Sequence, residues 1–138
     1  MARFFIKVID IIVTLIKDDH NNRKLIDSLD NLTRFYDELT TFYKKQGNCE
    51  LVEDYLKKKI LIRQKILGEF NEKVATAINN LAYFYAGQGR NELAEKHFYE
   101  ALRIYEHLTL IKGDNFKHYK LAINQKIQDL NNKAYPIE

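Results

Sequence analysis

The sequence has little of several residue types that particular fold classes need. Its 138 residues include one proline, five glycines, one cysteine and no tryptophan. So few prolines and glycines argue against a flexible linker and against the many tight turns of an all-β fold, and favour long helices. The lone Cys49 cannot form an internal disulfide, and no paired thiols point to a metal site. We therefore expect a cytoplasmic protein without metal or cofactor.

The overall composition is that of an ordinary folded protein. Hydrophobic residues make up 46% of the chain and charged residues 30%, which excludes a disordered or fibrous protein. A chain of 138 residues is long enough for one buried core, so we expect a single domain over residues 1–138. The net charge of +3 and the pI near 8.8 are mild, so nucleic acid is not an expected partner.

The N-terminal stretch MARFFIKVIDIIVTLIK is apolar enough to raise the question of a membrane span. Lys7 and Asp10 interrupt it, and no uninterrupted apolar run approaches the roughly 18–20 residues that a spanning helix needs. No small-residue cleavage site follows a clean apolar core. We predict neither a membrane span nor a secretion signal.

The same stretch has the pattern of a helix over residues 3–18 with one narrow polar stripe. The polar residues, spaced three or four apart, are Arg3, Lys7, Asp10, Thr14 and Lys17. The remaining surface is apolar and must be covered, by a second copy in a homodimer or by the rest of the chain's own domain. Binding at a membrane surface is a weaker alternative. The apolar residues expected to form the homodimer are Phe4, Phe5, Val8, Ile12 and Leu15.

Apolar residues recur every three or four positions along the rest of the chain, which predicts two helical hairpins. The first covers residues 23–67, with Gly47 at its turn. The second covers residues 71–108, with Asn71 as a helix cap and a glycine turn at residues 87–89. The second helices of the two hairpins are expected over residues 50–67 and 91–108.

A fifth helix is predicted at the C-terminal end of the chain. It follows Gly113 and covers residues 115–131, with Asp114 or Asn115 as its cap. Its apolar face is marked by Phe116, Tyr119, Ile123, Ile127 and Leu130.

The chain contains an internal repeat with a period of 42 residues. The stretch FYKKQGNCELVEDYL at residues 42–56 returns as FYAGQGRNELAEKHF at residues 84–98. A fixed period between 20 and 50 residues indicates stacked helical or strand units. The identical pairs are Leu39/Leu81, Phe42/Phe84, Tyr43/Tyr85, Gln46/Gln88, Gly47/Gly89, Glu50/Glu92, Leu51/Leu93, Glu53/Glu95 and Ile62/Ile104.

The second copy resembles the tetratricopeptide repeat (TPR), in which small residues let two helices approach closely and aromatic residues fill the space between hairpins. The 42-residue period and the stretches LGEFNEKVATAINNLAYFY and AEKHFYEAL are most similar to the repeats of kinesin light chains. Glu106 stands where the family has a proline. The residues at family positions are Ile78, Leu81, Ala82, Tyr85, Gly89, Ala94, Phe98 and Ala101.

The first copy matches the family less closely. Lys59 takes the place of the small residue at Ala101, and we expect its stem to lie along the core with the ammonium in water. The family positions that it does match are Tyr36, Leu39, Thr40, Tyr43, Gly47, Val52 and Leu56.

The resemblance implies an all-α fold: a short right-handed helical-hairpin (TPR-like) solenoid with flanking N-terminal and C-terminal helices. It also implies an adaptor or scaffold that binds a peptide or partner protein, since the first helix of each hairpin lines a concave groove in this family. Ordinary solvated helix residues are the alternative for the positions concerned. Those positions are Arg34, Glu38, Thr41 and Lys45 in the first copy and Thr76, Asn79, Asn80 and Tyr83 in the second.

Two other functions remain open from the sequence. A basic cluster on the second helix is most simply a solvated face, but it could bind RNA or an acidic ligand with the help of nearby aromatic residues. The chain could also be a purely structural subunit of a larger complex. The cluster consists of Lys57, Lys58, Lys59, Arg63 and Lys65.

An enzyme is not expected. The sequence has no phosphate-binding glycine loop, no HExxH and no nucleophile motif. His97 and His107 share a sector of one helix but lie too far apart along it to share a metal. The group at residues 18–20, Asp-Asp-His, is most simply a helix end that enters a loop.

Overall fold

The structure is a computed structural model that describes residues 7, 11 and 23–134. Every regular element among these residues is an α-helix. The chain divides into two compact units, Met1–Gly68 and Glu69–Glu138, and each is described by itself. The helix predicted over residues 3–18 lies outside the described residues except for Lys7 and Ile11, and so do all five residues proposed for the homodimer.

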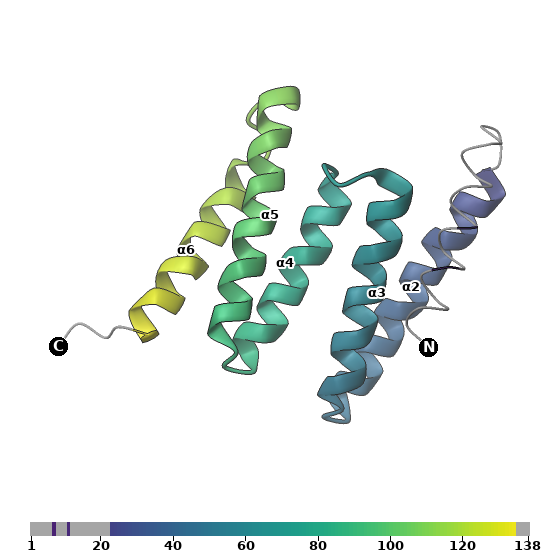
Figure 1. Ribbon diagram of the computed structural model, residues 1–138, viewed down its shortest axis with the longest axis horizontal. Helices are drawn as coiled ribbons and strands as arrows, with labels where there is room; N and C mark the ends of the chain where they lie inside the picture. The colour runs from purple at the N-terminus through teal and green to yellow at the C-terminus, as the bar shows by residue number, and fades with distance from the viewer. Residues whose placement is uncertain (1–6, 8–10, 12–22, 135–138) are drawn as a thin grey trace. The chain divides into compact units, whose positions relative to one another are not determined.

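The first unit contains an antiparallel helical hairpin of α2 (Arg23–Lys45) and α3 (Cys49–Leu67), as Figure 1 shows. Gly47 has a φ of +75° in the turn, a left-handed conformation that favours glycine. Asn48 then caps α3, because its side chain accepts a hydrogen bond from the backbone N–H of Leu51 at 3.3 Å. Both helices end where the sequence predicts. The core of this hairpin consists of Leu29, Tyr36 and Ile62, with Leu32, Leu39, Tyr55 and Ile66 packed against it.

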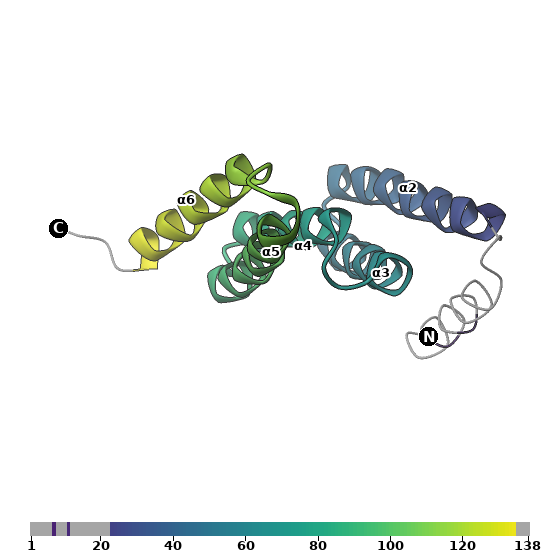
Figure 2. The same ribbon diagram turned by 90° about the horizontal axis from the view of Figure 1, so that it is seen from above.

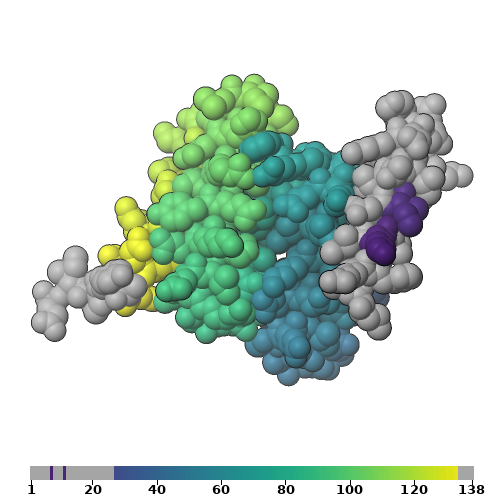
Figure 3. Space-filling model, in the orientation of Figure 1, coloured from purple at the N-terminus to yellow at the C-terminus, as the bar shows by residue number. Residues whose placement is uncertain are grey.

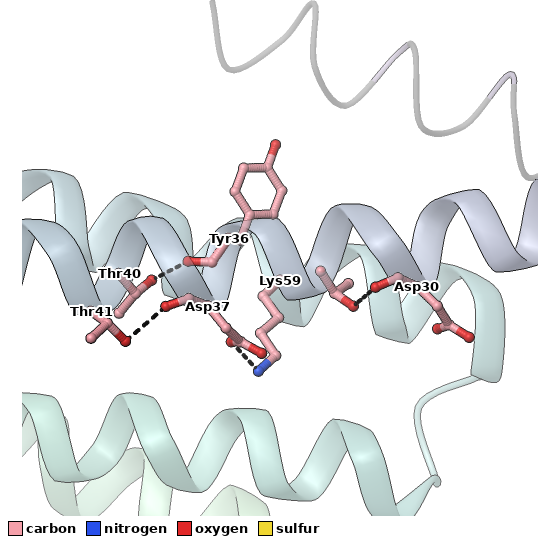
Figure 4. A network of polar contacts seen from close by, with 7 residues as sticks. Asp30, Tyr36, Asp37, Thr40, Thr41 and Lys59 are labelled. Atoms are coloured by element: carbon pink, nitrogen blue, oxygen red, sulfur yellow. Dashed lines mark hydrogen bonds and ion pairs between the residues drawn. The ribbon is translucent and has the colours of Figure 1, made fainter.

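The side chain of Lys59 differs from its prediction. Its ammonium was expected in water, but the residue is buried. Lys59 is buried at 6% exposure, and its Nζ donates to the carboxylate of Asp37 on α2 (Figure 4). A lysine held this deep in the hairpin needs a partner for its charge, and Asp37 lies within reach of the end of its stem. The side chain therefore joins the two helices of the hairpin instead of leaving the core.

The second unit contains α4 (Glu72–Gly87), α5 (Asn91–Lys112) and α6 (Lys117–Ala134). In Figures 1 and 2, α5 lies between the other two and runs antiparallel to both, so α4 and α6 run in the same direction. Asn71 caps α4 as predicted, because its side chain accepts from the backbone N–H of Lys73 at 2.9 Å. The largest fully buried side chains here belong to Tyr85, Tyr105, Phe98, Ile78, Leu81, Ile104 and Ile123.

Two predicted boundaries in the second unit are wrong. α5 continues four residues beyond 108, to Lys112, because nothing breaks the helix before Gly113, whose φ is +86°. α6 covers Lys117–Ala134 rather than 115–131. Its first turn is closed by a bond of 3.0 Å from the backbone N–H of Lys120 to the carbonyl of Phe116. The predicted caps, Asp114 and Asn115, therefore lie too early, and the Asp114 carboxylate is instead 3.5 Å from Nζ of Lys120.

The segment before α4 is fastened to α5. Glu69 forms an ion pair of 2.5 Å with Arg103, and the guanidinium of Arg103 lies 5.3 Å from the centre of the Phe70 ring. The Phe70 ring in turn lies 4.0 Å from the ring of His107. Figure 3 views the second unit from the α5 side, with α6 behind it. These contacts place the aromatic and charged side chains of the segment before α4 on α5.

Candidate functional site

The strongest candidate site is one side of α4, formed by Thr76, Asn79, Asn80 and Tyr83 and here called the α4 face. The helix buries its opposite side in the core of the unit, because its apolar residues recur at the helical period. Asn80 and Tyr83 are exposed, Tyr83 at 38%. The buried residues of α4 are Val74, Ala75, Ala77, Ile78, Leu81, Ala82 and Tyr85.

Thr76 connects the α4 face to α5. Its hydroxyl donates to the carbonyl of Glu72 at 3.0 Å, so in the 3.1 Å contact with the Tyr105 hydroxyl, tyrosine is the donor. Burial raises the pKa of the Tyr105 phenol, while the hydrogen bond to Thr76 lowers it by a smaller amount. Thr76 is thus partly buried and already bonded, and it positions the face rather than offering free polar atoms.

Asn79 carries a polar atom without a partner. Its Oδ1 is buried and has no hydrogen-bond partner in the described part of the chain. A buried acceptor without a hydrogen bond costs about 1–3 kcal/mol, and such atoms in folded proteins usually have a specific reason. Asn79 was predicted as one of the groove residues, and it is the residue of the α4 face with an unmet bonding capacity.

Tyr83 lies between α5 and α6. Its ring meets the edge of the Phe98 ring at 5.2 Å with an interplanar angle of 87°, which is a favourable aromatic geometry. Nζ of Lys126, on α6, lies 5.4 Å from the centre of the Tyr83 ring, within the range of a cation–π contact. α6 therefore borders the α4 face.

A second aromatic contact joins α6 to Tyr105 of α5, the residue whose hydroxyl meets Thr76 of the α4 face. The rings of Tyr105 and Tyr119 stack at 5.1 Å with an interplanar angle of 4°, and Tyr119 remains 45% exposed. From the sequence, Tyr119 was predicted only as part of the apolar face of the C-terminal helix, and Lys126 was not predicted as a site residue. Their spacing of seven residues, which places both on one side of a helix, was the available signal.

The corresponding residues of the first unit lie on the exposed side of α2. Arg34, Glu38, Thr41 and Lys45 are all exposed. The Thr41 hydroxyl donates to the carbonyl of Asp37 at 3.0 Å (Figure 4). This set contains cations and an anion, and none of its members has a buried polar atom without a partner. It is a weaker candidate than the α4 face.

The basic cluster of α3 is divided among ion pairs. Lys57 pairs with Glu53 at 3.1 Å and Lys58 with Asp54 at 2.9 Å, in each case one turn apart on the helix. Lys59 is buried against Asp37. Burial lowers the pKa of Arg63, and the nearby carboxylate of Asp37 opposes that effect. The cluster is therefore not a continuous surface of free positive charge.

The remaining residues that could bind a metal or take part in catalysis do not form a cluster in the described part of the chain. No three histidine, cysteine or acidic side chains of the described residues could hold a metal ion together. His97 contacts the carbonyl of Leu93 through Nδ1 at 2.7 Å, and His107 packs on Phe70. Cys49 is exposed and not in a disulfide. The acidic group at residues 18–20 lies outside the described residues.

Hairpins of similar length, each turned at a left-handed glycine, define the protein as an all-α helical-hairpin repeat protein. The family model of the tetratricopeptide repeat matches residues 32–107, more than half of the chain. The chain belongs to the tetratricopeptide repeat family, as the sequence indicated. No curated protein sequence matches the chain.

The family is one of non-catalytic repeats that generally mediate protein–protein interactions. The match covers both copies of the 42-residue motif but does not distinguish the kinesin-light-chain type from other members, so that narrower resemblance stays a prediction. Within the part of the chain that the structure describes, no helix is long and apolar enough to cross a membrane.

Proposed function

We propose that this protein is an interaction adaptor that binds a peptide or an extended segment of a partner protein on the α4 face. The observation that carries the proposal is the exposure of Asn80 and Tyr83 on the side of α4 opposite its buried residues. An asparagine amide offers a donor and an acceptor to a peptide backbone. A tyrosine ring offers apolar area with a polar tip at little cost in side-chain entropy.

Substituting the exposed residues of the α4 face tests this proposal. Partner proteins that co-purify with the full chain should be lost with Asn80→Ala combined with Tyr83→Ala. They should be retained with Tyr99→Ala, which removes a tyrosine of similar exposure, 50%, from α5. Circular dichroism melting curves show whether each variant folds. If the same partners remain bound to the folded double variant, the α4 face is not the binding site, and a structural subunit that uses other surfaces becomes the better account.

We further propose that residues 3–18 mediate self-association. The support is the narrow polar stripe of this segment together with Ile11, which is 61% exposed although it belongs to the apolar side. Ile11 follows Phe4 by seven residues and precedes Leu15 by four, a spacing that the helical period predicts to bring all three to one side. Light scattering of the full chain over a range of concentrations should give the mass of a dimer, and Phe5→Asp with Val8→Asp should give the monomer. A monomeric mass for the unsubstituted chain would remove this proposal.

We propose that the protein is located in the cytoplasm. Cys49 is exposed and free, and such a thiol persists more readily in a reducing compartment. Binding of RNA through α3 is not proposed, because Lys57, Lys58 and Lys59 already have acidic partners.

A further inference from the structure

The end of α5 carries the two most exposed large apolar side chains among the described residues. Leu110 is 87% exposed and Ile111 66%. The chain is anchored on both sides of this pair, because Leu108 and Phe116 are buried at 3% and 5%. Every residue from 110 to 115 is exposed, and in Figure 1 the last turn of α5 reaches beyond the start of α6. Residues 110–115 therefore project from the second unit and are here called the α5–α6 tip.

The packing of the second unit does not require apolar residues in this tip. The buried side of α5 ends at Leu108, and polar residues would continue the helix to Gly113 equally well. Removing a leucine or an isoleucine from water is favourable, and the exposed pair at 110 and 111 does not use this effect within the second unit. Single apolar residues on a surface are ordinary, whereas grouped ones indicate a contact with another surface.

A third apolar side chain lies at the same end of α5. Phe70 is 39% exposed, and its ring packs on the ring of His107 with 4.0 Å between the two centres. His107 precedes Leu110 by three residues and Ile111 by four, so it lies one turn before them on the same side of the helix. The Phe70 ring therefore extends the apolar surface of the tip toward the beginning of α4.

The residues around the tip are mainly basic. Between residues 110 and 120 there are three lysines and one aspartate, which gives a net charge of +2. The aspartate, Asp114, lies 3.5 Å from Nζ of Lys120. Lys112 and Lys117 are exposed and have no acidic partner among the described residues. Two unpaired cations thus stand directly beside the apolar side chains of the tip.

The start of α6 adds to the positive charge at this end of the unit. A helix N-terminus carries a partial positive charge and is stabilised by acidic residues in its first turn. The first turn of α6 has none, and Lys117, His118 and Lys120 lie there instead. This placement is electrostatically unfavourable in the isolated chain, and negative charges supplied by another surface would offset it.

We propose that the α5–α6 tip binds the surface of a membrane that contains anionic phospholipids. Leu110 and Ile111 enter the boundary between the headgroups and the acyl chains, and the ammonium groups of Lys112 and Lys117 pair with the lipid phosphates. Glu106 precedes Leu110 by four residues, so it lies about 6 Å further along the helix axis and stays in water. This binding is independent of the partner on the α4 face.

A lipid surface fits the tip better than a protein or an RNA does. A stable protein interface buries about 800 Å² on each partner, and one projecting turn offers a smaller area, whereas a bilayer needs no matching shape. RNA would pair with the lysines but leave Leu110 and Ile111 in water, since neither has a ring on which bases stack. The cytoplasmic leaflet carries anionic lipids, which agrees with the proposed location.

The test is co-sedimentation of the full chain with lipid vesicles. Vesicles of phosphatidylcholine that contain one quarter phosphatidylserine should bind at least fivefold more of the chain than vesicles of phosphatidylcholine alone. High salt should weaken the binding, because it screens the lysines from the phosphates. Equal sedimentation with both kinds of vesicle, or none with either, would overturn the proposal.

A substitution of the apolar pair assigns the binding to the tip. Leu110→Ser with Ile111→Ser keeps the charge of the chain and should lower binding to the anionic vesicles at least fivefold. The control is Tyr99→Ser, which removes a 50% exposed apolar side chain from the same helix away from the tip and should bind within twofold of the unsubstituted chain. Circular dichroism melting curves compare the folding of the variants. A folded double variant that binds as well as the control would contradict insertion of the tip.

The charges are tested in the same way. Lys112→Gln with Lys117→Gln should lower binding to the anionic vesicles at least threefold. Lys96→Gln with Lys133→Gln removes the same charge at two other exposed residues of α5 and α6 and should stay within twofold. Equal losses in the two double variants would show that only the net charge of the chain matters, and the tip would not be the site.

An environment-sensitive dye reports on the depth of the tip. In a Cys49→Ser background the chain has no other thiol, so Leu110→Cys or Tyr99→Cys carries the dye at one position. On addition of anionic vesicles, the emission should shift to the blue from position 110 and stay unchanged from position 99. An unchanged emission from position 110 would show that the tip does not enter the lipid.

The apolar segment at residues 3–18 is tested separately. Phe5→Asp with Val8→Asp should keep the preference for anionic vesicles, because each copy of the chain retains its tip. Loss of vesicle binding in this variant, together with full binding by Leu110→Ser with Ile111→Ser, would assign the membrane contact to the N-terminal segment and overturn the proposal.

Discussion

Lys59 and Asp37 form an ion pair between α3 and α2 in which the two partners have very different surroundings. The lysine side chain is 8% exposed and the aspartate side chain 49%. The lysine stem takes the place of a small residue in the repeat, and the carboxylate lies at the surface, where water also reaches it. The half-exposed carboxylate of Asp37 is therefore the partner of the buried charge of Lys59 (Figure 4).

We expect Asp37→Ala to destabilise the protein by about 2 kcal/mol, because it leaves the ammonium of Lys59 buried without a partner. This figure is below that for a fully buried pair, since Asp37 is half exposed. The measurement is the free energy of unfolding from urea denaturation followed by circular dichroism.

Asp54→Ala is the matched control for that substitution. The side chain of Asp54 is 50% exposed, almost the same as that of Asp37, but its partner Lys58 is 26% exposed and one turn away on the same helix. We expect a loss of at most about 0.5 kcal/mol. Equal effects of the two substitutions would show that the burial of Lys59 does not decide the stability of the hairpin.

Replacing each of two neighbouring glycines by alanine should change the stability of the protein in opposite directions. Gly89 has a φ of +77° in the turn between α4 and α5, so Gly89→Ala should cost about 1–2 kcal/mol of backbone strain. Gly87 is the last residue of α4, without a left-handed φ and with open space around a new Cβ. Gly87→Ala should be stabilising by up to about 0.5–1 kcal/mol. Thermal melting of the two variants compares them directly, and loss of stability in both would contradict the described turn.

Ionisation of the Tyr105 phenol should lower the free energy of unfolding at alkaline pH. Folding raises the pKa of its phenol through burial, so the native state holds the proton more tightly than the unfolded chain does. The resulting stability is fully present below the ordinary tyrosine pKa of about 10 and is lost as the pH rises through the raised pKa. Urea denaturation near pH 8 and near pH 11 should show a smaller alkaline loss for Tyr105→Phe than for the unsubstituted chain.

Tyr119→Phe serves as the control for the alkaline measurement, because Tyr119 is 45% exposed and contacts the same ring. It should keep the alkaline loss of the unsubstituted chain. If Tyr105→Phe keeps that loss as well, the Tyr105 phenol does not cause it.

The helix boundaries that are set by a single glycine or by a capping side chain were predictable from the sequence. Gly47 and Gly68 end helices because both have a positive φ, and Asn71 caps α4 with its own side chain. The all-α fold class and the tetratricopeptide repeat family followed from the repeated motif and are confirmed. α5 ends four residues later than predicted, because no helix-breaking residue precedes Gly113.

Contacts between distant residues were not predictable in the same way. The partner of Lys59 is 22 residues away on another helix, and no local pattern identifies it among the acidic residues of the chain. The contact of Lys126 with Tyr83 likewise depends on how α6 packs on the second unit. The unmet acceptor of Asn79 depends on which side chains surround it in the folded chain, and no local pattern of the sequence defines them.

The proposed function requires that partners bind the α4 face rather than the exposed side of α5. The most direct test places a photo-crosslinking amino acid at Tyr83 or at Tyr99, two tyrosines with exposures of 38% and 50% on different helices, and illuminates cells that express the full chain. We expect discrete crosslinked partner proteins from position 83 and none of these from position 99. Crosslinks from position 99 alone would contradict it.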